Sequence, residues 1–282
     1  MRWRRGKPKR RRAGKDGRQP GVASTNGRND IILETEGLTK EFRGFVAVSD
    51  VTLQVRRGSI HGLIGPNGAG KTTCFNLLTK FLPPTRGAIR YDGRDITGLK
   101  PAEVARLGLV RSFQISAVFP HLSVLENVRL ALQRARGGSF DFWRSEALLK
   151  TFDARAFELL DDVGLTEYAR VNAGELPYGR KRALEIATTI ALDPVMLLLD
   201  EPTAGMTHED VDRIIALVKR VAQGRTVLLV EHNLKVVAGL CDRITVLTRG
   251  RVLAEGDYAE VSANPEVQAA YLGTDPGFEG AH

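Results

Sequence analysis

Cysteine is scarce in this chain, and long apolar runs are missing. Its 282 residues include only Cys74 and Cys241, so there is no disulfide framework, and a reducing, cytosolic compartment is expected. No apolar run approaches the roughly 18 residues that a membrane-spanning helix needs. The N-terminus is charged and no apolar segment follows it, so we expect no secretory signal. Neither an internal repeat nor a heptad run is visible, which argues against repeat arrays and coiled coils.

Acidic residues are also scarce in the first 30 residues, which contain eleven Lys and Arg but only Asp16 and Asp30. The whole chain has a net charge of +8, so the remainder carries a net charge of −1. This segment is rich in Gly and Pro and almost free of apolar residues, which predicts a disordered basic tail over residues 1–30. The tail could attract anionic lipid or nucleic acid. We favour the alternative, in which the tail is merely solvated or results from a start site assigned too far upstream.

One stretch of the chain matches the phosphate-binding P-loop pattern G-x-x-x-x-G-K-[ST]. It consists of Gly65, Pro66, Asn67, Gly68, Ala69, Gly70, Lys71, Thr72 and Thr73. An apolar strand precedes it and an apolar helix face follows it, as the pattern requires, which disfavours a chance glycine-rich turn. Backbone N–H groups and the helix N-terminus would face the phosphates, with Lys71 on the outer phosphates and Thr72 on Mg²⁺. The sequence therefore predicts a nucleoside triphosphate site.

Two acids follow a second apolar strand, predicted over residues 195–199. Asp200 and Glu201 would lie at the carboxyl edge of a parallel sheet, where open α/β sheets bind ligands. There Asp200 could hold Mg²⁺, and Glu201 could accept a proton from the attacking water. Solvated acids at a strand end are the alternative, which the P-loop makes much weaker.

Two further polar residues follow strands of the same predicted sheet. His232 comes after the strand predicted over 226–230, where its imidazole could contact the γ-phosphate. Gln114 follows the strand predicted over 109–113 and could reach Mg²⁺ or water. A structural role is the alternative for either residue taken alone.

The order of predicted elements indicates an α/β fold with an insertion. Alternating patterns near residues 46–55 and 88–91 predict an antiparallel β-layer toward the N-terminus. Helical patterns at 124–136, 145–150 and 154–163 predict a helical insertion. Apolar runs typical of buried parallel strands then return, separated by an amphipathic helix predicted over 211–222.

Together these motifs resemble the ATP-binding subunit of an ABC transporter, over about residues 31–273. Five separated motifs occur in the family's order. The P-loop matches Walker A, residues 196–201 match Walker B with the catalytic acid, Gln114 matches the Q-loop and His232 the switch histidine. Phe42 matches the aromatic that stacks on adenine, and simple core packing is the alternative for this ring.

The resemblance implies a fold class, a P-loop NTPase of ABC type. It would have a mixed or parallel core sheet, an N-terminal antiparallel β-layer and a helical insertion subdomain at about 115–176. A basic tail at 1–30 and a C-terminal tail at 274–282 would flank the ATPase domain.

The resemblance also implies a second ABC ATPase subunit, identical or different, that closes face to face on this one around two ATP molecules. A signature loop would contact the partner's ATP, and here it is formed by Leu176, Pro177, Tyr178, Gly179 and Arg180. This differs from the usual Leu-Ser-Gly-Gly-Gln, because proline brings neither a hydroxyl nor an N–H. The D-loop usually ends in Asp, where this chain has Thr207.

A finer resemblance points to the importer branch for branched-chain and related amino acids. The matching segments are residues 75–79, 125–128, 184–187 and 264–273. It implies two membrane permease subunits, an extracytoplasmic solute-binding protein and a peripheral position on the cytoplasmic face of the inner or plasma membrane. Importers of urea or short amides share much of this pattern.

Two rival functions are weaker. A soluble ABC ATPase acting on nucleic acid or ribosomes would usually carry two ATPase units or coiled-coil insertions, so we expect no specific nucleic-acid partner. An exporter ATPase for lipid or lipopolysaccharide is disfavoured by the C-terminal resemblance.

Overall fold

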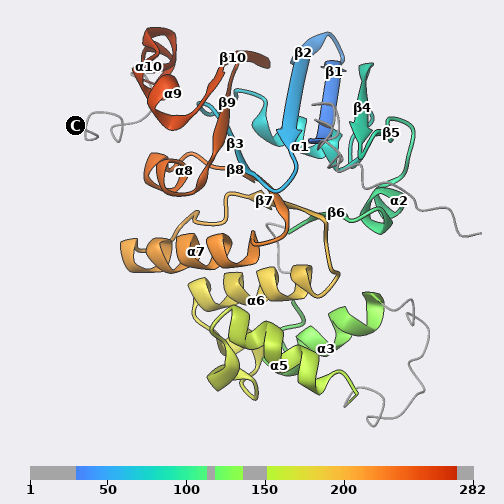
Figure 1. Ribbon diagram of the computed structural model, residues 1–282, viewed down its shortest axis with the longest axis vertical. Coiled ribbons are helices and arrows are strands. Elements are labelled where there is room, and N and C mark those ends of the chain that lie inside the picture. The colour runs from blue at the N-terminus through green and yellow to red at the C-terminus, as the bar shows by residue number, and fades with distance from the viewer. Residues whose placement is uncertain (1–29, 113–117, 136–150, 272–282) are drawn as a thin grey trace, which may run out of the picture.

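The computed structural model describes residues 30–112, 118–135 and 151–271 (Figure 1). Several sequence predictions lie outside these residues. They concern the basic tail, Gln114, the helix at 145–150 and the C-terminal tail.

The larger sheet is a mixed sheet with the P-loop strand near its middle. Its strands run in the order β10-β9-β3-β8-β7-β6, and every neighbouring pair is parallel except β9 and β10. Its members are β3 (Ile60–Ile64), β6 (Leu109–Arg111), β7 (Met196–Asp200), β8 (Thr226–Val230), β9 (Arg243–Thr248) and β10 (Arg251–Gly256). This agrees with the mixed or parallel core sheet that the family resemblance implied.

The smaller sheet is antiparallel and lies in the N-terminal part of the chain. Its order is β2-β1-β4-β5, formed by β1 (Ile31–Phe42), β2 (Phe45–Arg56), β4 (Arg86–Tyr91) and β5 (Arg94–Asp95). Helix α1 (Lys71–Leu78) buries its apolar side chains in the core cluster that both sheets share. The antiparallel β-layer of the prediction is therefore confirmed.

The central strands are buried on both faces, which explains their continuous apolar runs. In β7, Met196 and Leu198 pack into the core around α1, whereas Leu197 and Leu199 pack into the core on the other face. Successive side chains of a strand point to opposite faces, so one strand supplies both cores.

Helices cover the larger sheet, and a group of them forms a lobe below it in Figure 1 whose core is continuous with that face of the sheet. The lobe contains α3 (Val124–Ala135), α5 (Asp153–Asp162) and α6 (Tyr178–Ile190), which contact one another. The remaining helices are α2 (Pro101–Arg106), α7 (His208–Val221), α8 (Leu234–Leu240), α9 (Tyr258–Ala263) and α10 (Pro265–Tyr271), with short 3-10 turns at Thr166–Tyr168 and Ala173–Glu175.

Helix α7 begins earlier than its apolar pattern predicts. The predicted start was Val211, but the helix begins at His208 because Thr207 is its N-cap, with the hydroxyl accepting a hydrogen bond from Asp210 N. The first turn of the helix is polar, so apolar periodicity could not reveal it. Strand β7 also lies one residue later than predicted, and the apolar Val195 just before it is exposed.

A buried histidine makes the stability of this fold sensitive to acid. His61 of β3 lies against the Thr245 hydroxyl of β9, with 2.8 Å between Nε2 and Oγ1. Burial lowers the pKa of His61 from 6.5 to about 4. Between pH 6.5 and 4, His61 is therefore protonated in the unfolded chain but neutral in the folded chain. The contribution to stability is complete above pH 6.5 and is lost as the pH falls toward 4.

We expect this histidine to remove about 3 kcal/mol from the free energy of unfolding between pH 6.5 and 4. Denaturant titrations across this range would measure it. The variant His61→Gln should lose this part of the pH dependence, and His208→Gln, which changes an exposed histidine, should retain it. Equal acid slopes for His61→Gln and the wild type would contradict the assignment.

Candidate functional site

The P-loop joins β3 to α1 and is shaped by close backbone contacts. A Cβ atom at Gly65 would lie 2.1 Å from the Leu247 carbonyl oxygen, and one at Gly70 would lie 2.6 Å from the Ala47 carbonyl oxygen. Both glycines have positive φ angles, 150° and 98°. A side chain at either position would force the loop away from the strands behind it. The first and last glycines of the motif are thus required by packing.

Lys71 is buried inside this loop. Its ammonium group donates hydrogen bonds to the carbonyl oxygens of Gly65 (2.6 Å) and Pro66 (3.0 Å). Burial lowers its pKa, while the nearby carboxylates of Glu201 and Asp200 raise it. The loop therefore curls around a cation at the first residue of α1.

The opposite side of the loop is open to solvent. Asn67, Gly68 and Thr72 are exposed, whereas Ala69 and Lys71 are buried. The Thr72 hydroxyl is accessible at the first turn of α1, where helix N–H groups have no helical partner. This open rim can accept an anion, because a helix N-terminus and loop amides favour negative charge.

Asp200 ends β7 with its carboxylate buried at 1% exposure. Arg111, at the end of the neighbouring β6, donates to Asp200 Oδ2 at 2.6 Å and to Asn76 Oδ1 at 2.5 Å. Its guanidinium also stacks 5.0 Å from the ring centre of Phe75. Asp200 is thus a fixed negative charge beside α1 that is neutralised by an arginine from the adjacent strand.

Glu201 occupies a strained backbone position immediately after β7. Its φ angle is +43°, which is uncommon for a residue with a side chain and often marks a functional site. Its N–H donates to the Val230 carbonyl of β8 at 2.8 Å, which holds the turn against the next strand. The side chain remains partly exposed, at 28%. A carboxylate held in this way can accept a proton from a water molecule.

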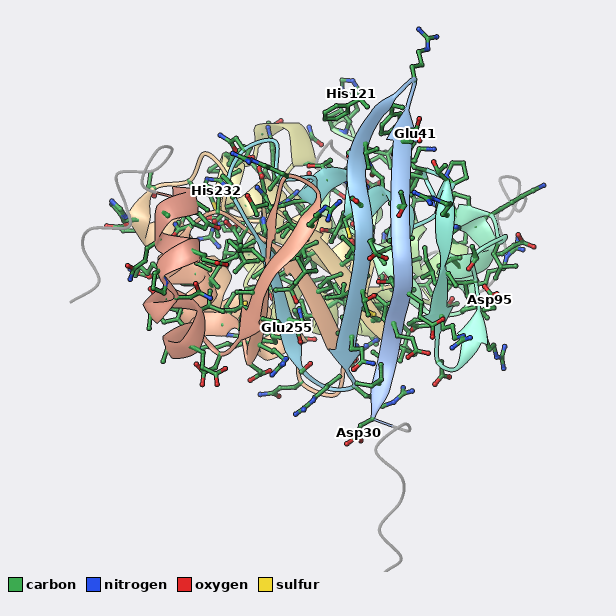
Figure 2. All side chains as sticks on the ribbon, turned by 90° about the horizontal axis from the view of Figure 1, so that it is seen from above. Asp30, Glu41, Asp95, His121, His232 and Glu255 are labelled. Atoms are coloured by element: carbon green, nitrogen blue, oxygen red, sulfur yellow. The ribbon has the colours of Figure 1, made fainter. Side chains whose placement is uncertain are left out.

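His232 lies close to the Glu201 carboxylate. This proximity was expected, because the strands that precede the two residues were predicted to be neighbours. Its Nδ1 atom is 3.9 Å from Glu201 Oε1, and its ring is 49% exposed. Figure 2 shows His232 toward the same end of the molecule as Glu41 near the end of β1, with Asp30 and Glu255 toward the other end. The end of β1 and the turn after β8 therefore lie at the same end of the molecule.

Phe42 is not part of the core, which removes the packing alternative. It is 41% exposed at the end of β1 and pairs with Phe45, which is 69% exposed, across the hairpin. The Lys40 ammonium lies 5.1 Å from the centre of the Phe42 ring. This hairpin presents two accessible aromatic rings to solvent.

The residues predicted as a signature loop lie at the start of α6. Pro177 is its exposed N-cap residue, Tyr178 is 60% exposed and Leu176 is buried. A Cβ atom at Gly179 would lie 3.1 Å from the Asp210 carboxyl group of α7. Arg180 turns back into the lobe, where it donates to the Gly164 carbonyl at 2.8 Å.

Two residues of the site region were missed in the sequence. Arg111 pairs with Asp200, and the buried Glu231 accepts hydrogen bonds from the turns after β7 and β8. Each stands at or just after the end of a strand of the larger sheet, which is the signal that could have identified them. Gln114 lies outside the described residues.

Comparisons with known proteins agree with the fold described above. The ABC transporter family profile matches residues 48–204, and a profile of branched-chain amino acid ATP-binding cassette transporters matches residues 251–276. The chain is 42% identical over 252 residues to the high-affinity branched-chain amino acid transport ATP-binding protein BraF of Pseudomonas aeruginosa, covering 86% of this chain and 98% of that protein. It is 40% identical, with the same coverage, to the corresponding protein LivG of Salmonella typhimurium.

Solved structures show the same architecture. An ATP-binding cassette of an ABC transporter, in its ADP conformation, superposes with a TM-score of 0.74 at 30% identity, covering 86% of this chain and 99% of that one. A dimeric cassette bound to ADP and phosphate has a TM-score of 0.68 at 25% identity, covering 80% and 99%. By profile, sequence and fold, the chain belongs to the ABC transporter family, as one of its nucleotide-binding, ATP-hydrolysing subunits.

Proposed function

We propose that this chain hydrolyses Mg-ATP to drive import of branched-chain or related amino acids. The observation that carries the hydrolytic part is the meeting of three motifs at the carboxyl edge of one sheet. The P-loop follows β3, His232 comes just after β8, and Asp200 and Glu201 lie at the end of β7, with β8 paired to both other strands. Ligands of open α/β sheets bind at such an edge.

The P-loop and the β1–β2 hairpin would hold the nucleotide. The backbone N–H groups of residues 68–73 would face the phosphates, and Lys71 would move from the Gly65 and Pro66 carbonyls to the outer phosphates. Phe42 would stack on adenine, as the family resemblance implies, and its accessible ring, which carries no core packing, is free to do so.

The residues present also fit a magnesium ion. Mg²⁺ prefers oxygen ligands and usually takes few of them from protein, so the exposed Thr72 hydroxyl and the Asp200 carboxylate are a suitable pair. Gln114 would add an amide oxygen. When bound, the ion would neutralise phosphate charge. The Asp200 carboxylate would then interact with both the ion and Arg111, which already donates a hydrogen bond to its Oδ2 atom.

Glu201 would orient the attacking water and accept its proton, and His232 would contact the γ-phosphate. Hydrolysis of a phosphoanhydride depends mainly on positioning and charge, so the protein needs few reactive groups. The strained Glu201 backbone and the 3.9 Å contact with His232 support this division of roles.

A second ABC subunit would complete each ATP site through its signature loop. In this chain the loop comprises Leu176, Pro177, Tyr178, Gly179 and Arg180, and the D-loop ends at Thr207. Arg180 is already engaged with Gly164, and the Thr207 hydroxyl caps α7 and donates to Asp210 at 3.1 Å. Neither polar side chain is therefore available without rearrangement, and Pro177 has no hydroxyl.

We therefore predict that, in a mixed pair of subunits, the ATP site completed by this chain's signature loop turns over more slowly. Loss of one hydrogen bond to a charged phosphate would cost about 1.5–3 kcal/mol. Turnover of each site can be measured alone by placing a Glu-to-Gln substitution in one partner at a time. Equal rates at the two sites would contradict the prediction.

Transport would need two permease subunits and an extracytoplasmic solute-binding protein, with this chain on the cytoplasmic face of the membrane. Among the described residues, no helix is long and apolar enough to cross a bilayer. The relatives reported above are named as ATP-binding proteins of high-affinity branched-chain amino acid transport, which supports this substrate class. The test is to purify the chain with its membrane subunits and binding protein, and to assay ATPase activity with leucine, urea and short amides. Stimulation by leucine is expected, and stimulation by urea or amides alone would overturn the substrate class.

A further inference from the structure

We propose that Glu231 is a positioning residue for ATP hydrolysis, which ties the turn after β7 to the turn after β8. The inference rests on the hydrolytic roles proposed above for Glu201 and His232. It concerns a buried residue to which the proposed function assigns no contact with nucleotide or metal.

Glu231 is completely buried, and both of its carboxylate oxygens accept hydrogen bonds. Oε1 accepts from Thr203 N at 3.1 Å and from Thr203 Oγ1 at 2.5 Å. Oε2 accepts from His232 N at 3.1 Å and from Asn233 N at 3.2 Å. One oxygen is therefore used by each turn, so the side chain bridges the two.

These contacts hold the backbone beside Glu201 and His232, the two residues proposed to act at the γ-phosphate. Thr203 lies two residues after Glu201, and the Thr203 carbonyl accepts a further bond from Met206 N at 3.2 Å. The second bridge between the turns is the bond from Glu201 N to the Val230 carbonyl at 2.8 Å. The 3.9 Å separation of Glu201 and His232 is thus set by a closed ring of contacts.

The chemistry of the bridge requires a carboxylate. All four partners are donors, and a carboxylate has only acceptor sites, which suits it to this place. An amide of the same shape would turn its NH₂ group toward the donors of one turn. Because the site is buried, the displaced donors could not bind water without opening the turn.

The test compares Glu231→Gln and Thr203→Val with the wild type in the full-length chain. Each should lower kcat for ATP by about 10- to 100-fold, the range that follows from losing hydrogen bonds to a charged group. ATP affinity, measured with a fluorescent ATP analogue, should change by less than about threefold, because the P-loop is untouched. Thr203→Ser retains the hydroxyl, so its kcat should stay close to that of the wild type.

Controls separate positioning from general stability and from the proposed function. Glu266→Gln alters an exposed acid on α10 and should behave as the wild type. If Glu231→Gln does not fold, as judged by thermal unfolding, the comparison of Thr203→Val with Thr203→Ser decides the question. Wild-type kcat in Glu231→Gln and Thr203→Val, with Glu201→Gln inactive, would overturn this inference alone. An active Glu201→Gln would instead overturn the proposed function.

Discussion

Replacing Glu201 by glutamine should lower ATP turnover by about 100- to 10,000-fold, the usual contribution of a positioned general base. Glutamine has the same shape and can still orient water, but it cannot accept a proton at neutral pH. Nucleotide affinity should remain nearly unchanged, because the P-loop residues lie on another strand and helix. Steady-state ATPase assays and binding of a fluorescent ATP analogue would measure the two quantities.

A matched control is available on helix α7. Glu209 is an exposed acid, with its side chain 86% accessible, so Glu209→Gln removes the same charge without touching the site. Its turnover should equal that of the wild type. Undiminished hydrolysis by Glu201→Gln would remove Glu201 from its proposed role.

Replacing Lys71 by alanine should weaken ATP binding by about 10- to 100-fold, the equivalent of losing a hydrogen bond to a charged group. Lys71 is the buried cation of the loop, and its carbonyl contacts with Gly65 and Pro66 show that its stem already lies along the loop. Removing it would also leave those two carbonyls without this donor. Turnover should fall with affinity, because the same ammonium stabilises charge that develops on the γ-phosphate.

The affinity can be measured by isothermal titration calorimetry with Mg-ATP and the full-length chain. Lys219→Ala removes an exposed lysine from α7 and serves as the matched control, with affinity expected to stay at the wild-type value. Thermal unfolding without nucleotide would show that the loop variant is folded. An unchanged affinity for Lys71→Ala would contradict the P-loop assignment.

Much of the fold could be predicted because its signals are local. The P-loop pattern identified the turn between β3 and α1, and continuous apolar runs identified β7 and β8 as buried strands. The placement of His232 near Glu201 also followed, since β8 pairs with β7 in parallel. For the P-loop and the buried strands, a short stretch of sequence carried the whole signal, whereas the placement of His232 also used the expected neighbourhood of β7 and β8.

The contacts that the sequence did not reveal depend on distant residues. Arg111 pairs with Asp200 because β6 lies beside β7, and Glu231 binds Thr203 across two turns. The start of α7 was missed for another reason, since its first turn is capped by Thr207 and has no apolar residue. Such contacts become visible only once the order of strands in the sheet is known.

The central claim is that the P-loop and the acids at the end of β7 act on the same nucleotide. A crystal structure of the Glu201→Gln variant with Mg-ATP tests it most directly, since slow hydrolysis would preserve the nucleotide. We predict phosphates against the backbone N–H groups of residues 68–73, with the metal beside Thr72 and Asp200. A triphosphate bound elsewhere, or a metal remote from both side chains, would contradict the account.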